Sequence, residues 1–162
     1  MKQKLFIFSI LGLIFCSCSN NQVQDQYKVM PNKQWHKDSI VSFKINEVDS
    51  ISKYNLFLNI RNTTDYEFSN IYLISSINFP NGKVVTDTLE YEMANSDGSF
   101  IGKEFGGVIE NKLWYKENVQ FTEEGDYVLE LKQAVRENGA IDGLNTLNGI
   151  QEIGFRIEKV NP

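Results

Sequence analysis

The sequence predicts an all-β protein with an antiparallel β-sandwich or jelly-roll-like fold of seven to eight strands. Most of residues 28–162 alternate apolar and polar side chains with a period of two, which is typical of strands that are buried on one face. Asn81-Gly82 separates two such runs, and an Asn-Gly pair is a strong local signal for a hairpin. We expect no major helix, because no stretch of about ten residues has a convincing helical period.

The first expected strand shows the pattern on which the others are also based. Val41, Phe43 and Ile45 face one way, between the polar residues Ser42 and Lys44. The complete set of expected strands is Val41–Ile45, Tyr54–Ile60, Ile71–Phe79, Lys83–Tyr91, Leu113–Phe121, Tyr127–Leu131 and Ile153–Ile157.

The connections between these strands are predicted from their turn residues. Asn81-Gly82 is expected to form a type I′ turn, which needs positive φ at both central positions. Residues 95–107 are expected to be an irregular loop with several glycines, and a polar loop over 137–149 has room for one helical turn.

The N-terminal residues 1–17 have the features of a cleaved lipoprotein signal peptide. Lys2 and Lys4 precede an apolar run that is shorter than the roughly 20 residues needed to span a bilayer. Cys16 and Cys18 both lie at its end. Small Ser17 before Cys18 favours cleavage there, and Cys18 is the expected lipidation site; cleavage of an ordinary signal peptide nearby is the alternative.

Cleavage at this site divides the rest of the chain into an anchor and a single domain. Residues 18–27 are expected to be the lipidated cysteine and a polar tether, and residues 28–162 one β-sandwich domain. At ~0.8 kcal/mol per buried CH₂, two or more acyl chains on Cys18 anchor a protein stably. No disulfide is expected, because Cys16 leaves with the signal peptide.

The charge distribution excludes one broad class of function. The whole chain has a formal net charge of −5, and its basic residues form no patch or stripe that would neutralise phosphates. Nucleic acid is therefore not an expected partner. The rest of the sequence also contains no apolar run long enough to span a membrane.

Two candidate catalytic features have simpler structural explanations. His36 is the only histidine, and a lone histidine needs partners that the sequence does not place near it. Glu90 and Glu92 share a strand face, as paired carboxylates of a glycoside hydrolase would, but Thr86 and Thr88 on the same face favour a solvated surface. A hydrolase would need the two carboxylates to converge in one cleft.

The loop after residue 93 resembles a calcium-binding loop in part. Asn95, Asp97, Gly98 and Glu104 fall at suitable positions, but Met93 stands where an oxygen ligand is required. A turn is the better interpretation, and no metal or cofactor is expected.

Aromatic residues are the best candidates for partner contacts. Either Trp114 or its neighbours Leu113 and Tyr115 must face outward. We select Trp114, Phe100, Phe105 and Tyr66 as candidate contacts, with residues 100–105 preferred because glycine-rich loops lie at surfaces. The alternative is that these rings complete the core.

Several stretches resemble the gliding-motility lipoprotein GldH family of Bacteroidetes, and together they cover nearly all of the mature chain. The similarity implies a lipidated Cys18 and a membrane-anchored accessory of the gliding and type IX secretion apparatus, with no catalytic residues. The stretches are PNKQWHKDSIVSF (31–43), YNLFLNIRN (54–62), FPNGKVVTDTLEYE (79–92), ENKLWYKEN (110–118) and GIQEIGFRIEK (149–159).

The sequence therefore favours a non-enzymatic lipoprotein of the cell envelope, expected at the outer membrane. Its expected partners are the membrane, through the anchor, and other gliding or secretion proteins; a small-molecule ligand is not expected. The alternative is a surface glycan-binding module, because jelly-roll sandwiches often hold sugars on aromatic platforms.

Overall fold

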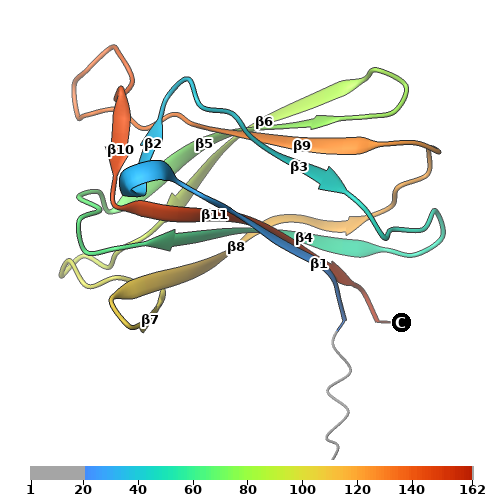
Figure 1. Cartoon of the computed structure of the whole chain (residues 1–162), viewed down its shortest axis with the longest axis horizontal. Helices are drawn as coiled ribbons and strands as arrows, with labels where there is room; N and C mark the ends of the chain where they lie inside the picture. Colours follow the sequence, from blue (N-terminus) through green and yellow to red (C-terminus); the bar gives the residue numbers. More distant parts are fainter. Residues whose placement is uncertain (1–20, 162) are drawn as a thin grey trace, which may run out of the picture.

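The computed structural model describes residues 21–161 and shows two antiparallel β-sheets packed face to face (Figure 1). Sheet A contains, in spatial order, β1 (Gln22–Val29), β11 (Ile150–Lys159), β4 (Tyr54–Asn62), β8 (Val108–Val119) and β7 (Lys103–Phe105). Sheet C contains β3 (Val41–Ile45), β9 (Tyr127–Gln133), β5 (Asn70–Asn78) and β6 (Val84–Glu92). A short sheet B pairs β2 (Gln34–His36) with β10 (Thr146–Asn148), and the 3₁₀ turn η1 (Pro31–Lys33) connects β1 to β2.

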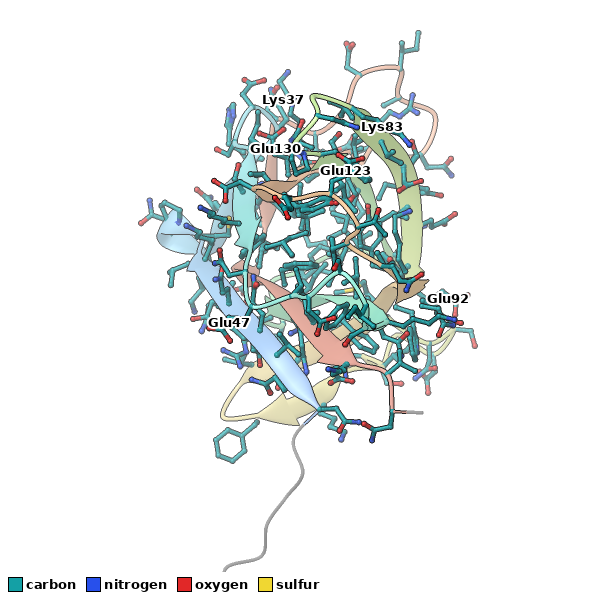
Figure 2. All side chains as sticks on the ribbon, turned by 90° about the vertical axis from the view of Figure 1, so that its right-hand side faces the viewer. Lys37, Glu47, Lys83, Glu92, Glu123 and Glu130 are labelled. Carbon is teal, nitrogen blue, oxygen red and sulfur yellow. The ribbon has the colours of Figure 1, made fainter. Side chains whose placement is uncertain are left out.

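The core lies between sheets A and C and is built from the alternating apolar residues. Leu58 of β4 and Leu129 of β9 are fully buried, and the rings of Phe43 and Phe155 meet across the two sheets with centroids 5.9 Å apart. Figure 2, which looks at the end where β1 begins, shows side chains filling this space and charged residues such as Glu47 outside it. Each side chain buried in this way contributes about 1.5–3 kcal/mol. The predicted antiparallel sandwich is confirmed.

Polar contacts join the two sheets at both open edges. At one edge Gln24 of β1 donates from Nε2 to the Lys44 carbonyl (2.9 Å), and its Oε1 accepts from the backbone N–H of Asn46 (2.8 Å). At the other edge the Tyr91 hydroxyl donates to the Trp114 carbonyl (2.6 Å). Because these groups are satisfied, the sandwich can close around its apolar core without unpaired polar atoms at these edge contacts.

The predicted tether is wrong for residues 22–27, which belong to β1. This strand pairs with β11 over nearly its whole length, from Gln22 opposite Glu158 to Val29 opposite Glu152. Its inward positions carry Gln24 and Gln26, so the strand has no apolar alternation that would reveal it. Together with the three-residue strands β2, β7 and β10, it raises the count in the described residues to eleven strands.

The predicted hairpin at Asn81-Gly82 is confirmed, but its turn type is wrong. The backbone N–H of Gly82 donates to the Phe79 carbonyl (3.0 Å), and the N–H of Phe79 donates to the Lys83 carbonyl (2.8 Å). Gly82 has φ +86°, whereas Asn81 is not among the residues with positive φ. Pro80 fixes a negative φ at the first turn position, so the loop is a three-residue turn closed by glycine.

Two predicted loops are more ordered than the sequence suggested. Residues 95–107 contain β7, and Ala94 bridges Phe100 in the part that precedes it. The segment 137–149 contains no helical turn and ends in β10 instead.

Gly149 offers a test of how tightly this end of the sandwich is packed. It has φ +78°, and a Cβ there would lie 2.7 Å from the Asp65 carbonyl carbon, which is backbone and cannot rotate away. We expect Gly149→Ala to lower the free energy of unfolding by about 2–5 kcal/mol, from backbone strain and overpacking together. Gly139→Ala is the control, because Gly139 has φ +82° with nothing near its Cβ position, and it should lose only about 1 kcal/mol. Equal losses in urea titrations would contradict the packing argument.

Candidate functional site

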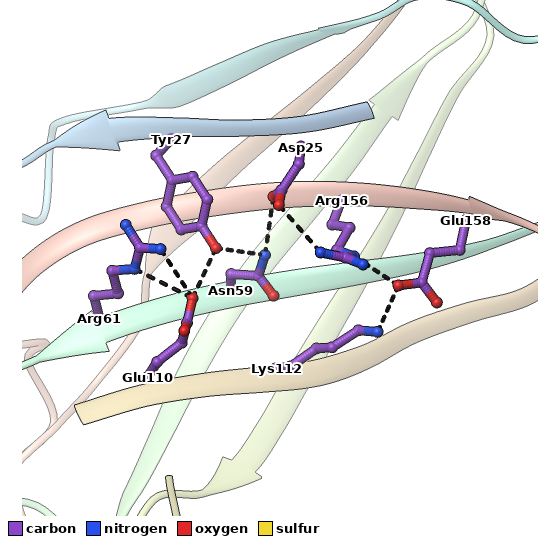
Figure 3. A network of polar contacts seen from close by, with 8 residues as sticks. All are labelled: Asp25, Tyr27, Asn59, Arg61, Glu110, Lys112, Arg156 and Glu158. Atoms are coloured by element: carbon purple, nitrogen blue, oxygen red, sulfur yellow. Dashed lines mark hydrogen bonds and ion pairs between the residues drawn. The ribbon is translucent and has the colours of Figure 1, made fainter. Parts of the chain in front are cut away.

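The outer face of sheet A, which points away from sheet C, carries a continuous set of polar side chains (Figure 3). Four adjacent strands contribute two residues each, spaced two apart so that both point outward. We call this set the polar network: Asp25 and Tyr27 of β1, Arg156 and Glu158 of β11, Asn59 and Arg61 of β4, and Glu110 and Lys112 of β8.

One half of the polar network is centred on Arg61. Its guanidinium donates to Glu110 (Nη2–Oε1, 3.0 Å) and to Glu152 of β11 (Nη1–Oε2, 2.6 Å). It also lies 3.9 Å from the centroid of the Tyr27 ring, and the Tyr27 hydroxyl donates to Glu110 (2.9 Å). The Tyr27 ring lies across Gly154, where a Cβ would be only 2.7 Å from the ring atom Cε1. Glycine at this position therefore lets the ring lie against the sheet.

The other half is centred on Arg156. This side chain donates to Asp25 (Nη1–Oδ2, 3.2 Å) and to Glu158 (Nε–Oε1, 2.6 Å). Lys112 donates to the same Glu158 oxygen (2.7 Å), and its ammonium lies 3.9 Å from the centroid of the Phe57 ring. Positive and negative groups therefore alternate across the strands.

Asn59 connects the two halves. Its Nδ2 donates to the Tyr27 hydroxyl oxygen (3.0 Å) and to Asp25 Oδ1 (3.4 Å). The side chain is almost fully buried within the polar network, and its Oδ1 has no hydrogen-bond partner in the structure. The two halves therefore form one hydrogen-bonded unit.

Burial and hydrogen bonding shift the pKa values in this unit. Burial, reinforced by the hydrogen bond to Glu110, raises the pKa of Tyr27 to about 12, so the phenol keeps its proton at neutral pH. Burial alone would raise the pKa of the Glu110 carboxyl, but the hydrogen bonds from Tyr27 and Arg61 outweigh it and hold the pKa below its ordinary value. Burial is also the largest influence on Asp25, and there it outweighs Arg156 and raises the pKa.

A hollow of about 440 Å³ lies over part of this surface. Residues of the polar network line it together with Ile101, Gly102 and Lys103. The hollow presents hydrogen-bond donors and acceptors, and both positively and negatively charged side chains, within a small area. Such a surface is suited to recognising a complementary polar surface.

Comparison with known proteins decides the family. The family model described as "GldH lipoprotein" matches residues 22–157, which include both sheets almost completely. The chain belongs to the GldH lipoprotein family. The resemblance seen in the sequence is therefore confirmed, and the protein is a lipoprotein held by a lipid in the cell envelope.

Two named relatives align with this chain over almost their whole length. The chain is 50% identical over 155 residues to the "Gliding motility lipoprotein GldH homolog" of Christiangramia forsetii, covering 96% of this chain and 94% of that one. It is 46% identical over 153 residues to "Gliding motility lipoprotein GldH" of Flavobacterium johnsoniae, covering 94% of each. Among solved structures, the VP2 subviral particle of infectious bursal disease virus aligns with a TM-score of 0.39 at 10% identity, over 86% of this chain and 33% of that chain.

Two of the aromatic residues selected from the sequence lie at the surface. Trp114 faces outward from β8, is 53% exposed and packs on Phe57 with ring centroids 4.4 Å apart. Phe105, at the end of β7, is 89% exposed. Val108 pairs with Phe105, so Trp114 lies about 20 Å further along β8 and the two rings do not form one patch.

The other two selected aromatic residues are placed differently. Tyr66 is 3% exposed, and its hydroxyl donates to the Asn70 carbonyl (2.7 Å), so it cannot serve as an exposed contact. Its expected exposure is wrong because the ring packs into the core beside Phe68. Phe100 is half-buried and also packs against the core.

The candidate catalytic residues lie on different strands, with His36 on β2 and the two glutamates on β6. His36 is exposed, and its Nδ1 accepts from the backbone N–H of Asp38 (3.3 Å). Glu90 and Glu92 are exposed on β6, as the solvated-face interpretation predicts; Glu90 accepts from Tyr72 (2.7 Å), whereas Glu92 lines the hollow beside sheet A.

The calcium-like loop forms a compact turn. Asp97 Oδ1 accepts from the backbone N–H (2.9 Å) and the hydroxyl (2.6 Å) of Ser99, and Glu104 lies in β7. Over residues 21–161, His, Cys, Asp and Glu side chains form no group of three or more that would hold a metal ion.

The predicted signal peptide (1–17) and the lipidation site Cys18 lie outside the described residues. Among the helices of the described part, none has both the length and the apolar character needed to cross a bilayer.

Sequence reasoning missed the polar network. A signal was present, because four segments carry polar or aromatic pairs at alternate positions. These pairs become a single surface only when the strand order of sheet A is known, and the sequence pattern does not give that order.

Arg156 offers a test of the polar network. We expect Arg156→Met to lower the free energy of unfolding by about 1–3 kcal/mol, because Asp25 and Glu158 each lose a charged hydrogen-bond donor. The loss should shrink as the pH falls and these carboxyls take up protons. Arg136→Met is the control, because Arg136 is exposed and should change stability by no more than about 0.5 kcal/mol. A neutral-pH loss no larger than that of the control in chemical denaturation would contradict the assignment.

Proposed function

We propose that the protein is a non-enzymatic accessory component of the gliding-motility and type IX secretion machinery, anchored to the outer membrane through acylated Cys18. The observation that carries this proposal is the match to the GldH family over residues 22–157. Relatives that are named for gliding motility align over almost their whole length, which supports the same role for this chain.

The outer face of sheet A supports a role in protein contacts. Arg61, Tyr27 and Trp114 are of the residue types that contribute most at protein interfaces. Hydrogen bonds and ion pairs already hold Arg61 and Tyr27 in place, so little side-chain freedom is lost when a partner binds. Trp114 is exposed further along the same face, where it pairs with Phe57.

Complementation of a deletion strain tests this function. Deletion should abolish colony spreading and reduce type IX secretion, and the wild-type gene should restore both. Cys18→Ala should fail to restore them because the anchor is lost, and Trp114→Ala should restore them only in part. Val84→Ala is the matched surface control, because Val84 is 54% exposed on β6 of the other sheet. Normal spreading and secretion in the deletion strain would refute the proposal, provided that no second copy of the gene is present.

A glycan-binding module is the second candidate, and the exposure of Trp114 favours it. Trp114 is 53% exposed on a face that also carries the charged side chains of Lys112 and Arg156; an aromatic ring stacks on a sugar ring, and charged groups bind its hydroxyls. In calorimetry with cell-wall and plant polysaccharides, this candidate requires measurable heat that Trp114→Ala abolishes and Val84→Ala retains. Under the leading proposal, we expect no binding by the wild-type protein.

A further inference from the structure

We propose that one end of the sandwich rests on the bilayer that holds the lipid anchor, with Ile51 inserted among the headgroups. We call this the membrane-facing end and define it by the start of β1, the end of β11 and the loop 46–53 between β3 and β4. The inference deepens the proposed function and rests on its anchor at Cys18.

The chain available between the anchor and the sheet is very short. The carbonyl of Asn21 accepts a hydrogen bond from the backbone N–H of Lys159 (2.7 Å), so the sheet already holds the chain at residue 21. Only Ser19 and Asn20 separate Asn21 from Cys18. Consecutive Cα atoms are at most 3.8 Å apart, which limits the reach from Cys18 to Asn21 to about 11 Å.

This reach is comparable with the thickness of the headgroup layer. A bilayer has a hydrocarbon core of about 30 Å within a total of about 40–45 Å, which leaves roughly 5–8 Å for each headgroup layer. With its acyl chains in the core, Cys18 lies at or below the headgroups. The end of the sheet that carries Asn21 is therefore held within a few ångströms of the membrane surface.

The loop 46–53 lies at this same end of the sandwich. The backbone N–H of Val160 donates to the Lys53 carbonyl (2.8 Å), and the Lys159 ammonium lies 3.5 Å from Asp49 Oδ2. In Figure 1 the loop between β3 and β4 projects on the side where β1 begins and where the C-terminus lies. Contacts close to Asn21 thus bring this loop to the membrane.

Ile51 is the apolar side chain that this loop presents. It is 85% exposed, although hydrogen bonds hold the backbone around it. Asp49 Oδ1 accepts from the N–H groups of Ile51 (2.9 Å) and Ser52 (2.6 Å), and the Tyr54 hydroxyl donates to Asp49 Oδ2 (3.0 Å). The Ile51 carbonyl accepts from the Gln120 amide (3.1 Å). These hydrogen bonds fix Ile51 at the end of the sandwich that the anchor keeps near the membrane, where insertion among the headgroups would remove its apolar surface from water.

The opposite end of the sandwich supplies a matched control residue. Ile141 is 89% exposed and lies in the loop that leads to β10. β10 pairs with β2, which the chain reaches only after the eight residues of β1, a rise of about 26 Å. Figure 1 shows the loop before β10 at the far end from the start of β1. Ile141 is therefore out of reach of the membrane in the proposed orientation.

Fluorescence quenching tests the orientation. Ile51→Cys and Ile141→Cys are produced as lipidated full-length proteins, labelled with an environment-sensitive fluorophore, and placed in vesicles of phosphatidylethanolamine and phosphatidylglycerol. Acylated Cys18 does not react with the dye, and the wild-type protein measures the background. Lipids that carry a quencher near the headgroup should quench the label at residue 51 at least several-fold more than the label at residue 141. Equal quenching at the two positions, or stronger quenching at residue 141, would overturn the inference.

Flotation of the same samples distinguishes this inference from the proposed function. Protein that fails to float with the vesicles has no anchor, and both the orientation and the anchored role are then lost. Protein that floats but has an unquenched label at residue 51 overturns the orientation alone. The role in gliding is tested separately, by the deletion strain.

Discussion

The polar network and the membrane-facing end both depend on the antiparallel pairing of β1 with β11. It places Asp25 opposite Arg156 and lays the Tyr27 ring across Gly154, which completes the polar network. The same pairing ends at the hydrogen bond between Asn21 and Lys159, which in the proposed orientation holds the sandwich close to the membrane. Without β1, sheet A would end at β11, and the Gln24 contacts that join the sheet to β3 would be lost.

The strands that the sequence predicted correctly are those that bury one apolar face. Examples of such buried residues are Phe43, Leu58 and Leu129. Apolar and polar residues alternate in these strands because one face of each strand is buried, and this alternation is what the sequence shows. The sequence did not predict β1 because its inward residues, Gln24 and Gln26, are polar. Gln24 instead forms hydrogen bonds with the backbone at and after the end of β3. The hairpin turn was misassigned because Pro80, which precedes the Asn-Gly pair, fixes the backbone of the turn.

The sequence did not predict the polar network, for a different reason. Asp25 and Arg156 are 131 positions apart, and they meet because a strand near the start of the chain pairs with the final strand. Local periodicity gives the face on which a side chain lies, but it does not give the neighbour of each strand. Trp114 shows the same limit, because alternation left two orientations open and the packing on Phe57 selected one.

If the protein is anchored through Cys18 as proposed, the short tether also determines which surfaces a partner protein can reach. In the proposed orientation, β1 runs away from the membrane-facing end, and the outer face of sheet A extends from the bilayer toward solution. A partner can therefore dock against the polar network without displacing lipid. Part of the network is shielded from solvent; Arg156 and Asp25, for example, have side chains 23% and 20% exposed, so salt weakens their attraction less than that of fully exposed pairs. Their fixed geometry then favours specificity for the partner over strength of binding.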